Sequence, residues 1–262
     1  MSARTGRVPS ADAAAAHLAG FHAVREALRA GAPLRFVAFN RERRDPRAAE
    51  LLAQLRAAGV AVRFETAAAL DRLAPGQRHQ GVVAVAEAKA TLALEDLLPQ
   101  ATAGLLIACD GIEDPQNLGA IVRSASAAGA DGLLLPQRRS AGLSAVVERV
   151  SAGALQHLPV ARVPNLVQAL DRCRQLDWWT VGLHPDAPTS IWQHDFRPRT
   201  VLVVGAEGRG LHQLTRQRCD VLVSIPMASA IGSLNAAAAS AIALFELRRQ
   251  RTASSRGNLD AP

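Results

Sequence analysis

Three short segments of this chain contain side chains that could bind and orient a reactive ligand. The first carries Asn117 and Arg123, an amide and a guanidinium six residues apart. The second is a glycine-rich stretch whose one carboxylate is Glu207. The third carries Ser233 and Asn235 directly before an alanine-rich run. Because a carboxylate repels phosphate groups, the second segment favours a ligand that is cationic or offers hydroxyl groups.

Each segment taken alone also has an ordinary structural explanation. Asp114 and Pro115 are typical of a helix N-cap and first turn, so the first segment fits a capped surface helix. The second reads G-x-x-G-x-G and fits a tight turn, since it matches neither the dinucleotide fingerprint nor a phosphate-binding P-loop. Ser233 and Asn235 lie where short polar side chains cap backbone N–H groups.

Alternating strand and helix patterns place all three segments after expected strands. Short apolar strands are expected at residues 105–109, 132–135, 158–163, 178–183, 201–204 and 221–225. Helical patterns separate most of them, at residues 118–128, 144–155, 166–176, 211–216 and 233–249. This order indicates an α/β fold with a parallel sheet covered on both faces. Ligands of such sheets bind beyond the carboxyl ends of the strands, where the three segments lie.

A smaller α/β series precedes this one. Helices are expected at residues 22–30, 46–58 and 66–73, and strands at 35–39, 60–64 and 81–87. The resulting division is a disordered leader (1–17), a small α/β domain (18–88), a linker (89–103), a catalytic domain (104–250) and a flexible tail (251–262).

The charge of the chain is concentrated in its first third. Of the net +7, residues 1–90 contribute +6, from 14 basic against 8 acidic residues. A basic module joined to a nearly neutral one indicates a polyanion-binding part and a chemical part. The candidate phosphate contacts are Arg25, Arg29, Arg41, Arg43, Arg44 and Arg47. GC-rich coding, rather than selection for phosphate contacts, is an alternative source of the excess, since 29 of the 30 basic residues are arginines.

Other sequence features limit the class of protein. No apolar run approaches the ~18 residues of a membrane-spanning helix. The three cysteines, Cys109, Cys173 and Cys219, are few and far apart, which argues against a disulfide framework or a zinc site. We therefore expect a cytoplasmic protein with reduced thiols, no membrane partner and no metal.

Together the three segments resemble a known enzyme family. They read D-x-x-x-D-P-x-N-x-G-x-I-x-R-S-A, then G-A-E-G-x-G, then I-P-M-x-x-x-x-x-S-L-N, in that order. This combination is similar to the SpoU branch of the SPOUT RNA methyltransferases. The resemblance extends over residues 20 to about 250 and includes Gly20-Phe21-His22-Ala23-Val24 and His79-Gln80-Gly81.

The resemblance implies a function that composition and periodicity do not reach. It implies methyl transfer from S-adenosylmethionine to a ribose 2′-hydroxyl of RNA, with a guanosine of 23S ribosomal RNA as the expected substrate. It implies a C-terminal trefoil knot, a homodimer, and a ribosomal-protein L30e-like RNA-binding domain before the catalytic domain. The implied catalytic residues are Asn117, Arg123, Glu207, Ser233 and Asn235, and the implied cofactor-binding residues are Gly205, Ile225 and Leu234.

Several alternatives remain open from the sequence. A transfer-RNA methyltransferase or an antibiotic-resistance ribosomal RNA methyltransferase of the same family would carry the same motifs. A dinucleotide-dependent oxidoreductase would share the parallel sheet and a glycine-rich turn, but the early fingerprint is missing. A non-catalytic RNA-binding protein could keep the fold, but it would not need the five implied catalytic side chains.

Overall fold

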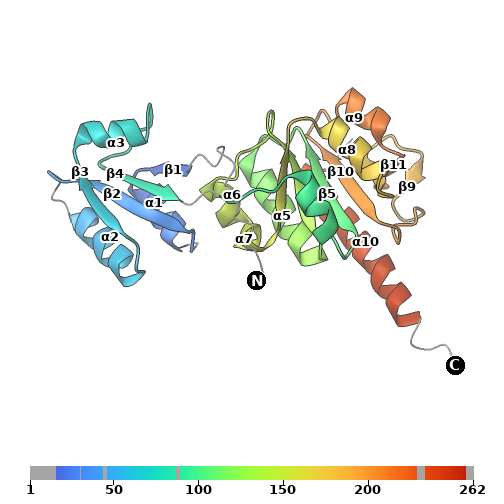
Figure 1. Cartoon of the computed structure of the whole chain (residues 1–262), viewed down its shortest axis with the longest axis horizontal. Coiled ribbons are helices and arrows are strands. Elements are labelled where there is room, and N and C mark those ends of the chain that lie inside the picture. The colour runs from blue at the N-terminus through green and yellow to red at the C-terminus, as the bar shows by residue number, and fades with distance from the viewer. Residues whose placement is uncertain (1–15, 30, 44–45, 87–88, 229–233, 258–262) are drawn as a thin grey trace, which may run out of the picture. The chain divides into compact units, whose positions relative to one another are not determined.

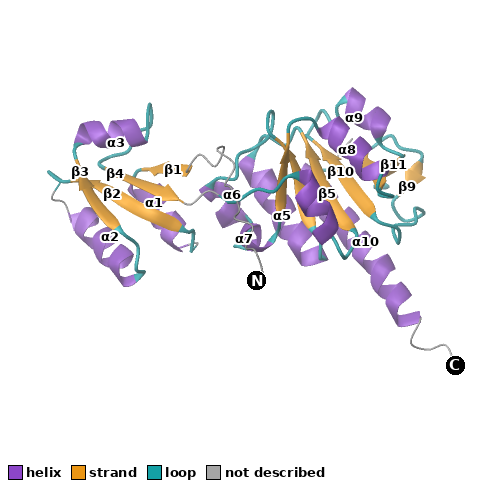
Figure 2. Ribbon diagram, viewed as in Figure 1, coloured by secondary structure: helices purple, strands orange, loops and turns teal. Residues whose placement is uncertain are grey.

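The computed structural model describes residues 16–29, 31–43, 46–86, 89–228 and 234–257 (Figures 1 and 2). The chain divides into two compact units. One comprises residues up to 90 together with 143–149, and the other comprises residues 91–142 and those from 150 onward. None of the described helices is long and apolar enough to span a membrane.

The first unit is a four-stranded sheet with helices on both faces. Its strand order is β1 (Ala16–Ala19), β4 (Val82–Ala86), β2 (Leu34–Asn40) and β3 (Val62–Glu65). β2 and β3 are parallel, whereas β4 is antiparallel to β1 and β2. Helices α1 (Phe21–Arg29) and α2 (Pro46–Ala57) pack against one face, and α3 (Ala67–Leu73) packs against the other. Since successive side chains of a strand point to opposite faces, the apolar residues of β2 serve both cores.

Strand β1 is the element of this unit that the sequence pattern does not predict. Residues 16 and 17 fall in the expected leader, yet they pair with Ala86 and Val85 of β4. The segment is half alanine and has no β-branched residue, so its local strand propensity is low. Its position comes from main-chain hydrogen bonds to β4, which leave no periodic signal in the sequence. Thr66 caps α3, because its hydroxyl accepts from the Ala69 amide at 3.2 Å.

The second unit is the expected parallel sheet, with seven strands. In order they are β7 (Val160–Val163), β6 (Gly132–Pro136), β5 (Leu105–Asp110), β10 (Thr200–Gly205), β8 (Trp179–Leu183), β11 (Val221–Ser224) and β9 (Thr189–Ser190). Every neighbouring pair is parallel. All six residues of β5 and of β10 are buried, which explains why both strands read as continuous apolar runs.

Helices cover this sheet in two groups. The core on one face joins α4 (Leu94–Leu97), the following 3-10 turn η1 (Leu98–Gln100) and α8 (Leu166–Arg174) to alternate strand residues. Helices α5 (Pro115–Ala128) and α10 (Ala236–Gly257) pack against each other and α10 also contacts β10. The short helix α9 (Gln213–Arg218) lies beside α8, as Figure 1 shows.

Three expected boundaries need correction. Residues 94–101 fall in the expected linker, but Leu94, Leu97, Leu98 and Ala101 are buried in the core of the second unit. The helix expected at 144–155 is two helices, α6 (Ala145–Val150) and α7 (Ala154–His157). They are separated because Ala152 and Gly153 adopt left-handed φ values of 52° and 82°.

Helix α10 continues to Gly257, past its expected end at Arg249 and into the expected tail. Arg251 accounts for part of this extension. Its guanidinium donates to the carbonyls of Ala103, Gly104, Phe196 and Pro198 at 2.7–3.1 Å. These acceptors lie far from Arg251 in the sequence, so no local sequence pattern predicts the contacts.

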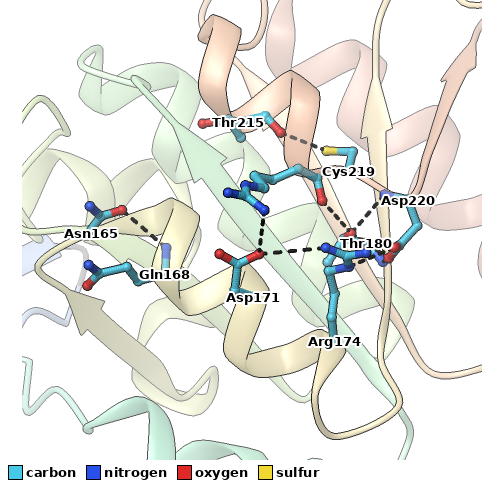
Figure 3. A network of polar contacts seen from close by, with 9 residues as sticks. Asn165, Gln168, Asp171, Arg174, Thr180, Thr215, Cys219 and Asp220 are labelled. Carbon is cyan, nitrogen blue, oxygen red and sulfur yellow. Dashed lines mark hydrogen bonds and ion pairs between the residues drawn. The ribbon is translucent and has the colours of Figure 1, made fainter.

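A polar network fixes the amino-terminal end of β8 relative to its neighbours (Figure 3). Asp220, just before β11, accepts from the Arg174 Nε at 2.7 Å. Its other carboxylate oxygen accepts from the amide and the hydroxyl of Thr180, at 2.9 and 2.7 Å. The carboxylate thereby joins α8, β8 and β11. It helps to fix the position of β11 beside β8, and therefore the point at which the chain leaves β11.

The three cysteines are free thiols; Cys109 and Cys173 are buried and Cys219 is partly buried. Burial raises the pKa of each thiol to about 12. We predict that an aromatic disulfide reagent at about pH 8 labels the folded protein slowly and the urea-unfolded protein fully, since thiolate is the reactive form. Rapid labelling of all three thiols in the folded protein would contradict this burial.

The same shift gives stability a pH dependence. Unfolded thiols ionise near their ordinary pKa of ~8.5, while the folded thiols stay protonated. A raised pKa of this kind contributes stability that is complete below the unfolded value and is lost as the pH rises toward the folded value. The free energy of unfolding in urea should therefore fall from about pH 8 to about pH 11. The fall should be smaller in Cys109→Ala, whatever that variant's stability at pH 8.

Candidate functional site

The carboxyl edge of the second sheet brings the candidate segments together. β5 and β10 are neighbours, and their last residues, Asp110 and Gly205, are register partners. The segments that follow them leave the sheet side by side. β11 lies beyond β8, two positions from β10, whereas Asn235, which follows β11 in the chain, lies beside the other two segments.

The first segment enters α5 through a well-formed cap. The Asp114 carboxylate accepts from the amides of Gln116 and Asn117, at 3.0 and 3.3 Å, and Pro115 occupies the first turn. This confirms the cap expected from the sequence. It places Asn117 in the first turn of the helix, half-buried, with its side chain at the carboxyl edge of the sheet.

The glycine-rich segment closes on itself. A Cβ on Gly205 would lie 2.1 Å from the carbonyl carbon of Gly210, so only glycine allows the chain to fold back there. The Gly210 amide donates to the Ala206 carbonyl at 2.8 Å, and both Gly208 and Gly210 have positive φ. The resulting tight turn presents the exposed Glu207 at its tip.

Asp110 and His212 join the first two segments. The carboxylate of Asp110, which is buried, accepts from the His212 amide at 2.8 Å and contacts its Nδ1 at 2.9 Å. Gly111 has a φ of 74°, and a Cβ there would lie 2.8 Å from the His212 ring. The ring therefore lies directly over the chain as it leaves β5.

The Asn235 side chain connects all three segments. Its Nδ2 donates to Asn117 Oδ1 at 2.8 Å and to Glu207 Oε2 at 3.1 Å. Its Oδ1 accepts from the amides of Ala237 and Ala238, at 2.9 and 3.3 Å, and so caps α10. A carboxamide has two N–H groups and one oxygen, and all are engaged here. Asn235 is thus a helix cap and, at the same time, the link between the other two segments.

A cavity of about 330 Å³ lies beside this link. Its apolar lining includes Val204, Val223, Ile225, Met227 and Leu234, and its polar lining includes His184, Asp186, Glu207 and Arg209. Gly205, Ile225 and Leu234, the three expected cofactor-binding residues, all line it. A volume in this range suits a small organic ligand. The lining suits a ligand with an apolar ring at one end and hydroxyl or cationic groups near Glu207.

Not every expected site residue joins this cluster. Arg123 lies on α5 with an exposed side chain, and it has no hydrogen bond or ion pair with another described residue. Ser233 lies outside the described residues. No group of side chains that could hold a metal occurs in the described part of the chain.

The cavity also involves residues that sequence reasoning missed. Leu183, the last residue of β8, lines the cavity together with His184, Pro185 and Asp186, which follow it. They lie at the carboxyl end of an expected strand. The rule that ligands bind beyond the carboxyl ends of parallel strands therefore applies to them as well. No sequence motif indicated a role for His212, because its hydrogen bonds are to Asp110, which lies 102 residues away in the chain.

The Asp110–His212 contact can be tested through stability. Asp110→Ala leaves the His212 amide and ring without their acceptor, which should cost about 1–3 kcal/mol of unfolding free energy. His212→Ala should cost less, since the backbone amide keeps its bond to the carboxylate. Urea unfolding measures both, and hydrogen exchange at residue 212 should accelerate in Asp110→Ala alone. Equal costs for the two variants would contradict the backbone contact.

Comparison with known proteins agrees with this geometry. Residues 104–245 match the SpoU rRNA Methylase family, and residues 18–92 match the family described as RNA 2′-O ribose methyltransferase substrate binding. The chain is 43% identical to the 23S rRNA (guanosine-2′-O-)-methyltransferase RlmB of Bordetella pertussis, over 89% of this chain and 97% of that protein. It is 39% identical to RlmB of Shewanella oneidensis, over 88% and 96%.

Solved structures are similar as well. The SpoU methyltransferase AviRb from Streptomyces viridochromogenes, in complex with the cofactor AdoMet, superposes with a TM-score of 0.62 at 29% identity. The match covers 90% of each chain. With both family models, full-length relatives and this fold in agreement, the chain belongs to the SpoU rRNA methylase family.

Proposed function

We propose that this protein transfers the methyl group of S-adenosylmethionine to the ribose 2′-hydroxyl of a guanosine in 23S ribosomal RNA. The observation that carries the proposal is the Asn235 link, which joins Asn117 and Glu207 beside a ligand-sized cavity. The substrate is inferred from relatives named for it that match nearly their whole length.

The cavity fits the family's cofactor by its chemistry. S-adenosylmethionine supplies an electrophilic methyl on a sulfonium, together with an adenine and a ribose. Apolar walls from Ile225 and Leu234 would hold the adenine, and the backbone at Gly205 would lie against it. Glu207 would favour the positive charge and the hydroxyl groups of the ligand. The oxidoreductase alternative loses support because the glycine-rich turn after β10 does not follow the order of the dinucleotide fingerprint.

The remaining residues would act on the RNA. A 2′-hydroxyl is a weak nucleophile and must lose its proton as it attacks. Arg123 would polarise it together with an RNA phosphate, because a guanidinium donates hydrogen bonds and does not accept a proton. Asn117 would help to hold the hydroxyl in line for attack. Asn235, whose polar atoms are all engaged, would act as a positioning residue that fixes Asn117 and Glu207. Ser233 keeps its place in the proposal from the motif alone.

The assembly is also part of the proposal. Residues 18–88 would form a ribosomal-protein-like RNA-binding domain, and residues 104–250 a catalytic domain with a trefoil knot. The contacts of Asn235 with Asn117 and Glu207, which bring the chain after β11 back to the segments that follow β5 and β10, support a knotted path. The homodimer is inferred from the family resemblance, and its interface would cover some of the exposed large apolar side chains, such as Trp192, Leu214 and Phe245. A cytoplasmic location follows from the proposed substrate.

Mapping of ribose methylation tests the substrate directly. Ribosomal RNA from cells lacking this protein should lose one guanosine 2′-O-methylation in 23S RNA, and expression of the protein should restore it. Transfer RNA from the same cells should be unchanged. Loss of a transfer-RNA methylation with intact 23S RNA would instead favour the transfer-RNA alternative.

Arg123 should be essential for turnover but not for cofactor binding. Arg123→Ala should reduce the methylation rate at least about 100-fold, as the loss of a preorganised charge-stabilising donor does. Arg123→Lys should restore little, because an ammonium lacks the planar fork of a guanidinium. Arg216→Ala, at an exposed arginine of α9, is the matched control. A near-normal rate for Arg123→Lys would contradict the specific guanidinium role.

The two roles of Asn235 can be separated by substitution. Asp caps helices about as well as Asn, so Asn235→Asp should keep the stability of α10. It removes both Nδ2 hydrogens and places a carboxylate next to Glu207, so methylation should fall about 100-fold. Asn235→Ala should lose activity and also about 1 kcal/mol of stability. Asn165→Asp, at the cap of α8, is the control and should change neither. Full activity of Asn235→Asp would show that the link is dispensable.

A further inference from the structure

Two motifs of the first unit take no part in the site described above. Gly20-Phe21-His22 begins α1, and His79-Gln80-Gly81 precedes β4. They meet in space, since the Gly20 amide donates to the Val82 carbonyl at 3.0 Å. The end of β2 joins them, because the amide of Asn40, its last residue, donates to the Gly81 carbonyl at 2.8 Å.

The turn at residues 79–81 is held from several sides. His79 Nδ1 accepts from the Gly81 amide at 3.0 Å, and its Nε2 contacts Asp71 at 3.0 Å. The Arg43 guanidinium donates to the Gln80 carbonyl and also lies over the Phe21 ring. Gly81 has a φ of 82°, which favours glycine, and a Cβ there would lie 2.9 Å from Arg43 Cδ.

This support keeps Gln80 in an unfavourable backbone conformation. Its φ is 52°, a left-handed value that glycine adopts at less cost. None of the backbone contacts of the turn needs a side chain at this position. The Gln80 side chain is exposed, and its carboxamide has no hydrogen-bond partner among the described residues. A strained residue with a presented, unpaired side chain is typical of a recognition element.

The surroundings of Gln80 indicate what it would recognise. Arg41 and Arg78 are exposed in the two segments that flank the turn, and Arg43 lies against it. Residues 1–90 carry most of the chain's net positive charge. A carboxamide can donate and accept at once, so it can pair with a base edge or with a ribose hydroxyl. An uncharged hydrogen-bonding side chain beside arginines suits RNA, because the arginines would contact the RNA backbone while the carboxamide contacts a base or a ribose.

We propose that Gln80 is an RNA-reading residue, presented by the turn 79–81, with Arg41 and Arg78 contacting phosphates beside it. The inference rests on the proposed function, because it takes ribosomal RNA as the substrate. It adds the face of the first unit that contacts that RNA, and it separates a reading residue from phosphate-binding ones.

The test uses the full-length protein and unmodified 23S ribosomal RNA transcribed in vitro. Gln80→Gly relieves the backbone strain, so its melting temperature should be equal to or above that of the wild type. Its Kd for the RNA should rise about tenfold, as expected for the loss of a paired side-chain contact. Affinity for S-adenosylmethionine, which the second unit binds, should not change. Gln77→Ala, at an exposed glutamine of the same loop, is the control and should bind as the wild type does.

The salt dependence separates the two kinds of contact. Arg41→Gln and Arg78→Gln should each lower the slope of log affinity against log salt by about 0.7–0.9. Gln80→Gly should leave that slope unchanged while weakening binding at every salt concentration. Wild-type RNA affinity in Gln80→Gly would overturn the inference, as would a slope reduced by this neutral substitution.

Failure of this inference and failure of the proposed function are distinguishable. If the wild-type protein methylates 23S RNA and Gln80→Gly binds normally, only the assignment of Gln80 fails. If the wild-type protein binds and methylates no 23S RNA, the substrate proposal fails first, and this inference fails with it.

Discussion

The geometry of the site depends on how one carboxamide is shared. The Asn235 oxygen caps the longest helix of the second unit, and its nitrogen holds Asn117 and Glu207. The cap fixes where α10 begins, and the position of α10 in turn fixes where the amide nitrogen lies. The helix that packs along α5 is therefore also the element that closes the site. A change in the packing of α10 against α5 would therefore displace the Asn235 amide and the Glu207 carboxylate that it holds.

The sheet order explains why such a link is needed. β5 and β10 are adjacent, so the segments after them meet without help, and Asp110 and His212 hold them together. The segment after β11 starts two positions away from β10, and Asn235 attaches it to the other two segments. The cavity lining includes Ile225 and Met227 after β11, and Leu234 and Ala236 on either side of Asn235.

Much of the architecture could be predicted from the sequence, because burial on both faces makes parallel strands read as apolar runs. Residues 105–109 and 201–204 are clear examples, and the glycine-rich segment follows the second of them. The caps at Thr66 and Asp114 were equally readable, since capping is a local interaction. The rule that ligands bind beyond the carboxyl ends of parallel strands was enough to predict that Asn117, Glu207 and Asn235 lie at one edge of the sheet.

What could not be predicted depends on contacts between distant residues. β1 exists because β4 offers it a free edge, and α10 is extended past Arg249 where Arg251 binds four carbonyls of distant loops. The sequence offered capping and catalysis as competing explanations of Asn235, whereas the structure shows that capping and linking coexist. The Asp110–His212 pair and the cavity wall after β8 were missed for the same reason. The trefoil knot that the resemblance implies would leave no mark on periodicity, and it stays a proposal.

The claim that Asn117 and Asn235 work as a unit is tested most directly by a double-mutant cycle on kcat/KM for methyl transfer. The cycle compares Asn117→Ala, Asn235→Ala and the double variant with the wild type. Since each single change breaks the same hydrogen bond, the double variant should lose little more than the worse single one, with a coupling energy above about 1 kcal/mol. Losses that simply add would mean that the two amides act independently, and the link described here would not organise the site.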